Sequence, residues 1–358
     1  MKIAIIADHR QEVLPPYKGG LAMITHKLYK KLEERGHEVR IFSNTDCNCQ
    51  DLNYLDNQFS EYDCFPCNSY NSFDASAIKS SIFYAEIFQH LRDYEYDIVQ
   101  NHSLHYLPIV LGNNLNTNFI TTIHTLEIPD IKFALNHIKK SVNQELILVS
   151  KCLQNRQTET LNANTVIHNA IDLEDWSPQT KVTGGYCMWY GSFCKQKAPH
   201  LAVEVALKAG MPIILAGRGK NTEYFKRFIE PLLKNSLVSY VGEQKQKQLN
   251  KLLNNAAALL FTSVWNEPSA LAISESLASG TPVLSWNIGV APELIIPEVG
   301  KLFEPLDTTG MAETLKNIGN FNRKKCRDYA EKNCNIENTV DAYLNFYETL
   351  QNENVEAY

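Results

Sequence analysis

The chain has 358 residues, of which 44% are hydrophobic and 21% charged, and its net charge at pH 7 is −6. This length favours two domains over one, and the composition is that of a globular protein, not of a disordered one. The negative charge argues against non-specific nucleic-acid binding, so we expect no nucleic-acid partner. Without an apolar run of membrane-spanning length or a signal-peptide pattern, the chain is expected to be cytoplasmic.

The nine cysteines are an odd number, in a chain large enough to fold without disulfides. We therefore expect free thiols in a reducing compartment. Cys47 and Cys49 form one close pair, and Cys64 and Cys67 form another, with spacings that zinc ligands also show. Because neither pair carries a second feature of a zinc module, loose surface thiols are the main expectation and a metal site is the alternative.

Strand and helix patterns alternate between residues 1 and 170. Ile3–Ala7 predicts a buried strand, and an amphipathic helix is expected between Leu21 and Leu32. Residues 44–76 are polar and predict a long irregular loop, of the kind that often carries function. The further elements expected in this part are the strands Val39–Phe42, Asp97–Gln100, Phe119–Ile123, Leu146–Ser150 and Thr165–Ile167 and the helix Ala77–Tyr94.

The composition turns polar between Asn169 and Gly185, which predicts a hinge before the alternation restarts. The strands expected after it are Tyr186–Tyr190, Ile213–Ala216, Val238–Val241, Leu259–Phe261 and Val283–Ser285, and the helices are Ala198–Ala209, Tyr224–Leu233, Gln246–Asn254 and one or two between Arg323 and Leu350. Two such series predict an α/β protein with two doubly wound, Rossmann-like domains, residues 1–171 and 172–334, facing a central cleft. Ligands of such sheets bind at the carboxyl ends of strands, which are the positions of Gly20, His124, Gly191, Gly217, Gly242 and Glu267.

Two glutamates, Glu267 and Glu275, stand eight residues apart around the start of a predicted helix. Ala256–Phe261 is a short apolar run suited to a buried parallel strand, and Pro268 fits the first turn of the helix that follows. The N-terminus of a helix offers free N–H groups and a positive dipole end. Glu267 is therefore expected at a phosphate-ready helix start, with Glu275 two turns further along. This arrangement favours a ligand with both phosphate and hydroxyl groups.

Five segments of the chain carry a resemblance to a known family. They are Gly19-Gly20 with the later Glu34-Arg35-Gly36-His37-Glu38-Val39; Ile123-His124; Ile167-His168-Asn169-Ala170-Ile171-Asp172; Tyr190 to Pro199, with Lys197 near its end; and Glu267 to Glu275, followed by Ala278-Ser279-Gly280-Thr281-Pro282-Val283. Each is weak alone. Their order and spacing resemble the GT-B-fold retaining glycosyltransferases of family 4, including the E-x7-E motif, over almost the whole chain.

The resemblance implies an enzyme that moves a sugar from a nucleotide diphosphate sugar, UDP-linked on family base rates, to an acceptor hydroxyl. The first domain would select the acceptor, which can be a sugar, a lipid-linked or a small-molecule compound, and the second would hold the donor. The C-terminal helices, residues 335–358, are expected to pack back on the first domain. No cofactor is expected, and because no Asp-x-Asp motif stands at a strand end, the enzyme is predicted to be independent of metal.

The resemblance also assigns the donor contacts. Lys197 would bind phosphate, with Lys195 as the competitor for that role, and Ser192 stands where the family commonly has an arginine, a loss that Arg218 could offset. Glu275 would bind the ribose hydroxyls and Glu267 the transferred sugar. Backbone contacts to phosphate or sugar are expected from Gly19, Gly20, Gly242, Ser269, Ala270, Leu271 and Ala272, with Ser269-Ala270 replacing the family's Phe-Gly.

His124 would lie near the donor sugar and the reacting centre, although a packed histidine is the commoner fate of such a residue. His102, Asp8, His9 and Arg10 follow neighbouring strands and are weaker candidates for the acceptor side. Lys27, Lys30 and Lys31 on the first helix allow weak contact with the inner face of a membrane, and their ordinary alternative is a solvated helix face.

Two rival functions are left open. One is a nucleotide-sugar-binding protein with little catalysis, which Ser192 and Ser269-Ala270 favour. The other is a sugar-nucleotide epimerase of the same architecture. A Rossmann dehydrogenase is disfavoured because no G-x-G-x-x-G follows the first strand.

Overall fold

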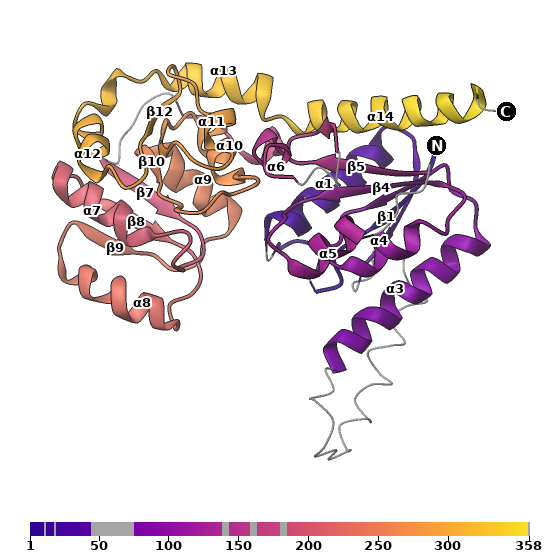
Figure 1. The fold of residues 1–358 in the computed structure, drawn as a ribbon. Helices are drawn as coiled ribbons and strands as arrows, with labels where there is room; N and C mark the ends of the chain where they lie inside the picture. Colours follow the sequence, from indigo (N-terminus) through magenta and orange to yellow (C-terminus); the bar gives the residue numbers. More distant parts are fainter. Residues whose placement is uncertain are drawn as a thin grey trace, which may run out of the picture. The chain divides into compact units, whose positions relative to one another are not determined.

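The computed structural model describes residues 1–10, 12–17, 19–43, 75–137, 143–157, 163–179 and 185–356. The predicted loop and the cysteine pairs Cys47/Cys49 and Cys64/Cys67 lie outside these residues. The chain forms two compact units (Figure 1), which are described separately. Unit 1 contains Met1–Val149, Leu153–Ile167 and Val340–Tyr358, and unit 2 contains Ser150–Cys152 and His168–Thr339.

Unit 1 is built on a parallel six-stranded sheet in the order β2-β1-β3-β4-β5-β6. Its strands are β1 (Lys2–Ile6), β2 (Glu38–Phe42), β3 (Ile98–Asn101), β4 (Asn118–Ile123), β5 (Gln144–Leu148) and β6 (Thr165–Val166). Its helices are α1 (Gly20–Glu34), α3 (Ala75–Asp93), α4 (Tyr106–Gly112) and α5 (Pro129–His137), and it shares α6 (Lys151–Gln154) and α14 (Ile336–Glu356) with unit 2.

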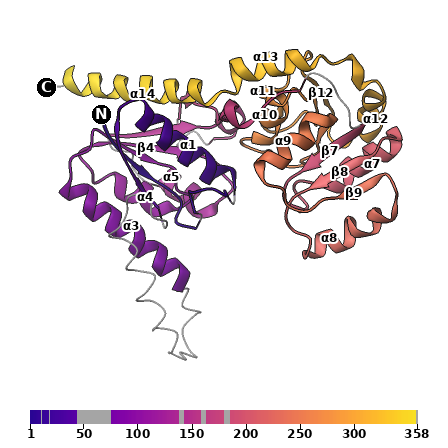
Figure 2. The ribbon, with the colours of Figure 1, turned by 180° about the vertical axis from the view of Figure 1, so that it is seen from behind.

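Both faces of the unit 1 sheet are covered, which explains why its central strands read as continuous apolar runs. Ala4 and Ile6 of β1 pack in one cluster with Tyr84 and Ile87 of α3. The last helix, α14, lies on the other face, where Tyr347 donates a hydrogen bond to the Gln100 side chain of β3. Figures 1 and 2 show α3 and α14 on opposite sides of this sheet.

Unit 2 repeats the architecture with the strand order β12-β11-β10-β7-β8-β9, again all parallel. Its strands are β7 (Tyr186–Tyr190), β8 (Ile213–Ala216), β9 (Val238–Tyr240), β10 (Ala256–Phe261), β11 (Val283–Trp286) and β12 (Gly300–Phe303). Its α-helices are α7 (Pro199–Ala209), α8 (Glu223–Phe228), α9 (Gln246–Asn255), α10 (Leu271–Ala278), α11 (Ala291–Leu294), α12 (Thr308–Lys316) and α13 (Arg323–Asn333), and its 3₁₀ helices are Leu173–Asp175, Glu230–Lys234 and Ile318–Asn320.

The predicted α/β class with two doubly wound sheets is confirmed, and the cleft expected between the domains stays a prediction. The sequence pattern missed α4, α5, α6, α11, α12 and β12. It also predicted one helix over Tyr224–Leu233, where the structure has α8 and then a separate 3₁₀ helix that contains Pro231. Proline lacks the N–H that a continuous α-helix needs at that position.

The start of α10 is a second correction. Pro268 was expected in its first turn, but the helix begins at Leu271, with Ala270 as its N-cap. The carbonyl oxygen of Glu267 instead accepts a hydrogen bond from the backbone N–H of Val290 at 2.9 Å. This oxygen is therefore engaged with another loop, and Glu267 lies in an irregular segment before the helix and not at its mouth.

Candidate active site

Three loops at the carboxyl ends of β7, β8 and β9 meet through glycine. Gly191 N donates to Ala216 O at 3.1 Å, and Gly217 N donates to Gly242 O at 2.9 Å. A Cβ atom on Gly217 would lie 1.8 Å from the carbonyl oxygen of Gly191, and its φ of +137° also disfavours any other residue. Glycine at 217 thus lets backbone pack on backbone, which sets the positions of Gly191 and Gly242.

The loop after Gly191 carries Lys197 and is held by residues that follow β10. Val264 N donates to Gln196 O at 2.8 Å, and Thr262 Oγ1 donates to Ala198 O at 3.1 Å. Ala198 adopts a left-handed conformation, with φ of +44°, directly before α7. These contacts fix the backbone on both sides of Lys197, whereas Lys195 is exposed. Of the two candidate lysines, Lys197 is the one with an acidic partner in the site.

Glu267 is the acidic partner. Lys197 Nζ lies 2.5 Å from Glu267 Oε2, and the Glu267 side chain is only 5% exposed. The other oxygen, Oε1, is buried and has no hydrogen-bond partner among the described protein groups. Buried polar atoms are satisfied in most native structures, so this oxygen is an acceptor that a ligand hydroxyl would complete. Gly289 supports the same position, because a Cβ there would lie 2.6 Å from Glu267 N.

Glu275 lies in the second turn of α10 and is buried. Tyr190 Oη donates to Glu275 Oε2 at 2.5 Å and also lies 3.1 Å from the carbonyl oxygen of Ala272. Burial raises the pKa of Glu275 to about 7, although the hydrogen bond from Tyr190 opposes this rise. Tyr190 was not predicted as a site residue. Its position two residues before Ser192, at a strand end, is the signal that could have identified it.

Two further side-chain hydrogen bonds involve predicted site residues of unit 2. One joins two of these residues, and the other joins one of them to the predicted hinge. Arg218 Nε donates to Ser192 Oγ at 3.2 Å, so a guanidinium lies beside the serine at which an arginine was expected from the resemblance. Asn169 Nδ2 donates to Ser269 Oγ at 3.2 Å, next to Ala270 and the first residues of α10, Leu271 and Ala272. The backbone N–H groups of a first helical turn have no partner within the helix, so these positions can donate to a ligand.

The candidates of unit 1 form a separate group. His124 follows β4 and His102 follows β3, and His102 Nδ1 lies 3.0 Å from His124 Nε2. Burial lowers the pKa of His124 to about 4 and that of His102 well below its ordinary value. Gly19 is the N-cap of α1 and has extended backbone, with φ of −175°, and Gly20 opens the helix. The roles expected of Gly19, Gly20 and His124 toward a donor stay predictions.

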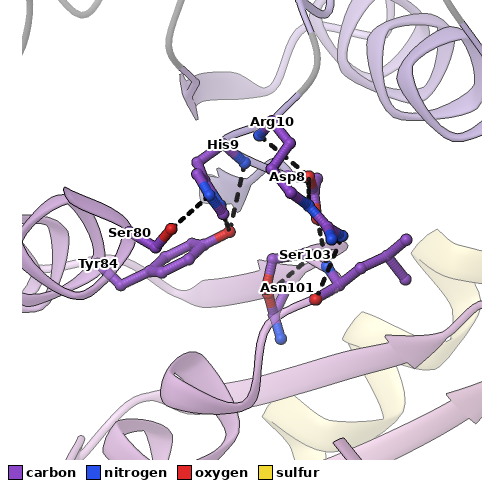
Figure 3. A network of polar contacts seen from close by, with 8 residues as sticks. Asp8, His9, Arg10, Ser80, Tyr84, Asn101 and Ser103 are labelled. Atoms are coloured by element: carbon purple, nitrogen blue, oxygen red, sulfur yellow. Dashed lines mark hydrogen bonds and ion pairs between the residues drawn. The ribbon is translucent and has the colours of Figure 1, made fainter. Parts of the chain in front are cut away.

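Asp8, His9 and Arg10 follow β1 and are tied into a polar network (Figure 3). The buried Asp8 carboxylate accepts from Arg10 Nε and Nη2, both at 3.0 Å, and from Leu104 N at 2.8 Å. His9 Nδ1 lies 3.1 Å from Tyr84 Oη, and His9 Nε2 lies 2.6 Å from Ser80 Oγ. Because Arg10 is paired with Asp8, its charge is already balanced locally.

No group of three or more His, Cys, Asp or Glu side chains is arranged in the described ranges to hold a metal ion. No helix in the described part of the chain is long and apolar enough to cross a lipid bilayer.

Comparison with known proteins connects this geometry to a family. Residues 18–175 match the model of "Glycosyltransferase Family 4", and residues 172–333 match that of "Glycosyl transferases group 1". A glycogen synthase of Mycobacterium tuberculosis is 24% identical over a region that spans 63% of this chain and 61% of that protein. Spore coat protein SA of Bacillus subtilis is 20% identical, with 97% of this chain and 99% of that protein covered.

Solved structures share the fold over nearly the full length. The sucrose-phosphate synthase of Thermosynechococcus elongatus has a TM-score of 0.75 at 18% identity and covers 98% of this chain and 99% of its own. HepE of Anabaena, in complex with UDP and glucose, has a TM-score of 0.67 at 16% identity. The match covers 98% of this chain and 99% of HepE. The two family models overlap at residues 172–175 and together span residues 18–333. The chain therefore belongs to the GT-B-fold glycosyltransferases, with a family 4 N-terminal half and a group 1 C-terminal half.

Proposed function

We propose that the protein is a retaining glycosyltransferase that moves a sugar from a UDP-linked donor to an acceptor hydroxyl, in the biosynthesis of a glycan, glycolipid or natural product. The observation that carries the proposal is the Glu267 carboxylate, which pairs with Lys197 through one oxygen and keeps the other buried without a protein partner. The solved structures of Anabaena HepE in complex with UDP and with UDP-glucose support the choice of donor.

In this proposal two carboxylates orient the donor. Glu267 Oε1 accepts a hydrogen bond from a hydroxyl of the transferred sugar, while Lys197 holds Oε2 and keeps the carboxylate in place. Glu275 accepts from the ribose hydroxyls, and the hydrogen bond from Tyr190 orients its carboxyl group. A hydroxyl-bearing ligand that satisfies these buried acceptors would bind more tightly than one that lacks the hydroxyls.

The remaining groups stabilise the leaving diphosphate. Negative charge grows on it as the bond to the anomeric carbon breaks. Lys197 and Arg218 bring positive charge to the diphosphate oxygens. Ser192 and the backbone N–H groups at Ser269 to Ala272 add hydrogen-bond donors. With these groups present the reaction needs no metal ion, and the acceptor attacks the face that the diphosphate leaves, which retains the anomeric configuration.

The test begins with ligand binding. A thermal-shift screen of UDP-, GDP- and ADP-sugars is expected to give the largest stabilisation with a UDP-sugar, since at equal concentration the ligand that binds most tightly raises stability most. Donor hydrolysis and transfer are then measured in excess EDTA. Full activity in the chelator agrees with the proposal, and complete loss of activity contradicts the metal-independent mechanism.

Glu267→Gln is the decisive variant. It keeps the side chain's shape but removes the charge that pairs with Lys197, so turnover is expected to fall by about 10²-fold. The affinity for UDP alone should change less than threefold, which is within about 1 kcal/mol. A matched control is Glu298→Gln, an exposed glutamate of the same unit. Unchanged turnover in Glu267→Gln would rule out the role given to this carboxylate.

The rival function of a nucleotide-sugar-binding protein with little catalysis is favoured by Ser192, which supplies no charge where the family has an arginine. Isothermal titration with UDP together with a donor-hydrolysis assay separates the two, because binding without turnover on any acceptor supports the rival. An epimerase would convert the donor without change of mass and without an acceptor, which mass spectrometry and sugar analysis detect.

A further inference from the structure

Two histidines of unit 1 share one hydrogen bond at the ends of neighbouring strands. His102 follows β3 and His124 follows β4, with His102 Nδ1 lying 3.0 Å from His124 Nε2. Neighbouring elements fix the position of His102. Its backbone N–H donates to Ile6 O at 2.8 Å, and its ring centroid lies 6.0 Å from that of Tyr343 on α14. His102 is 1% exposed, whereas His124 is half-buried.

Only one proton can lie between the two rings. Burial lowers the pKa of both imidazoles, so each ring is neutral at physiological pH and carries one N–H. Two arrangements satisfy the 3.0 Å contact. Either His102 Nδ1–H donates to His124 Nε2, or His124 Nε2–H donates to His102 Nδ1.

The far side of the His102 ring distinguishes these arrangements. His102 Nε2 is buried without a hydrogen-bond partner among the described groups. If His102 accepted at Nδ1, its own proton would be on Nε2, as a buried N–H with no acceptor. Orphaned buried N–H groups are rare and cost about 1–3 kcal/mol. If His102 donates at Nδ1, only a lone pair is left at Nε2, and every N–H of the pair has an acceptor or faces outward.

We propose that His102 is a positioning residue, which donates Nδ1–H to His124 Nε2 and thereby fixes His124 as the tautomer that presents Nδ1–H at the strand end. His124 Nδ1 has no protein partner in the described ranges and is not among the buried unsatisfied atoms. The pair therefore provides a single outward donor of fixed direction. A buried ring sets the tautomer, and an accessible ring makes the contact.

The consequence for catalysis rests on the proposed function, whereas the tautomer itself does not. An outward Nδ1–H donates to an oxygen, such as a substrate hydroxyl, and cannot accept a proton from an attacking hydroxyl. His124 would then orient substrate by a neutral hydrogen bond and take no part in proton transfer.

The direct test is nuclear magnetic resonance of the full-length protein with ¹⁵N-labelled histidine, which reads the protonation of each ring nitrogen. In the wild type, His124 is expected to show a protonated Nδ1 and an unprotonated Nε2 from pH 6 to pH 8. In His102→Leu the donor is lost, and His124 should shift toward the Nε2–H tautomer. His102→Asn keeps an N–H donor close to the place of Nδ1 and should restore the wild-type pattern.

The wild-type spectrum alone decides the proposal, even if the leucine variant fails to fold. A protonated Nε2 on His124 in the wild type overturns it, as does an unchanged His124 tautomer in a folded His102→Leu.

If the protein transfers sugar, His102→Leu should lower kcat/KM by about tenfold, the worth of one hydrogen bond, and His102→Asn should recover most of it. Affinity for UDP alone should stay unchanged in both variants. If the wild type shows the proposed tautomer but transfers no sugar, the proposed function is refuted and the tautomer assignment is not affected.

Discussion

Glu275 is the residue whose environment departs most from what its place in a motif suggests. It was expected on a helix, where it would bind the ribose hydroxyls. The structure buries it and places Tyr190 Oη 2.5 Å from its Oε2. Burial raises its pKa to about 7, and the charge of Asp175 adds to the rise while the Tyr190 hydrogen bond opposes it. Near neutral pH this carboxyl group is close to half-protonated when no ligand is bound.

This shift predicts a pH-dependent cost in stability. The pKa of Glu275 rises from 4.5 to about 7 on folding. Between these pH values the unfolded chain loses the proton while the folded protein keeps it, so the free energy of unfolding falls as pH rises through this window. Above pH 7 the penalty is complete and amounts to about 3 kcal/mol.

Glu275→Gln removes the penalty. Compared with the wild type, the variant should become progressively more stable as pH rises from 5 to 8, because its amide does not ionise. Urea unfolding at several pH values measures the difference. Glu304→Gln, which changes an exposed glutamate of the same unit, is the control and should show a flat difference. A flat difference for Glu275→Gln as well would mean that Glu275 titrates normally.

At the scale of elements, the glycine loops after β7, β8 and β9 contact one another at the candidate site. The sequence pattern identified Gly191, Gly217 and Gly242 as strand ends, but it did not reveal that they lie against one another. Gly217 makes this possible, because it combines a φ of +137° with backbone contact to Gly191.

Lys30 and Lys31 of α1 pair with Glu33 and Glu34, which leaves less charge there for the membrane contact predicted from the sequence.

Gly217→Ala is predicted to destabilise the protein by about 3–5 kcal/mol, since the added Cβ cannot fit without moving the Gly191 loop. Gly210→Ala is the matched control. Gly210 also has a positive φ, +70°, but a Cβ there would have no neighbour within 4 Å. It should cost about 1 kcal/mol, from the left-handed conformation alone. Chemical denaturation measures both changes, and equal effects would show that the close approach of the two loops is unimportant.

At the scale of the whole molecule, the chain leaves unit 1 at Ile167 and returns to it at Val340. The returning helix α14 then becomes part of the unit 1 interior. Tyr343 Oη lies 2.9 Å from Thr122 Oγ1, and Tyr347 Oη donates to Gln100 Oε1 at 3.0 Å, both buried. Gln100 and Thr122 stand on β3 and β4, the strands that lead to His102 and His124. Tyrosines of the last helix therefore support the strands that lead to His102 and His124.

Tyr347→Phe tests this support. It removes the hydroxyl and leaves Gln100 Oε1 buried without its donor, so the protein should lose about 1–3 kcal/mol of stability. Tyr94→Phe is the control, because Tyr94 is 59% exposed and surface changes stay within about 0.5 kcal/mol. Thermal and urea denaturation measure both. Equal stability of the two variants would show that the Tyr347 hydroxyl contributes nothing to unit 1.

The sequence by itself determined the α/β class, most strands, the family and the residues that carry its motifs, because each of these depends on a local pattern or a fixed spacing. It did not reveal where α10 begins, since the Glu267 carbonyl is taken by Val290, which local periodicity cannot show. Tertiary structure alone decided which groups meet. Lys197 pairs with Glu267 across 70 residues, Tyr190 with Glu275 across 85, and Tyr347 with Gln100 across 247. Such pairs form only when the parallel sheets and the helices that cover them bring side chains together that are far apart in the sequence.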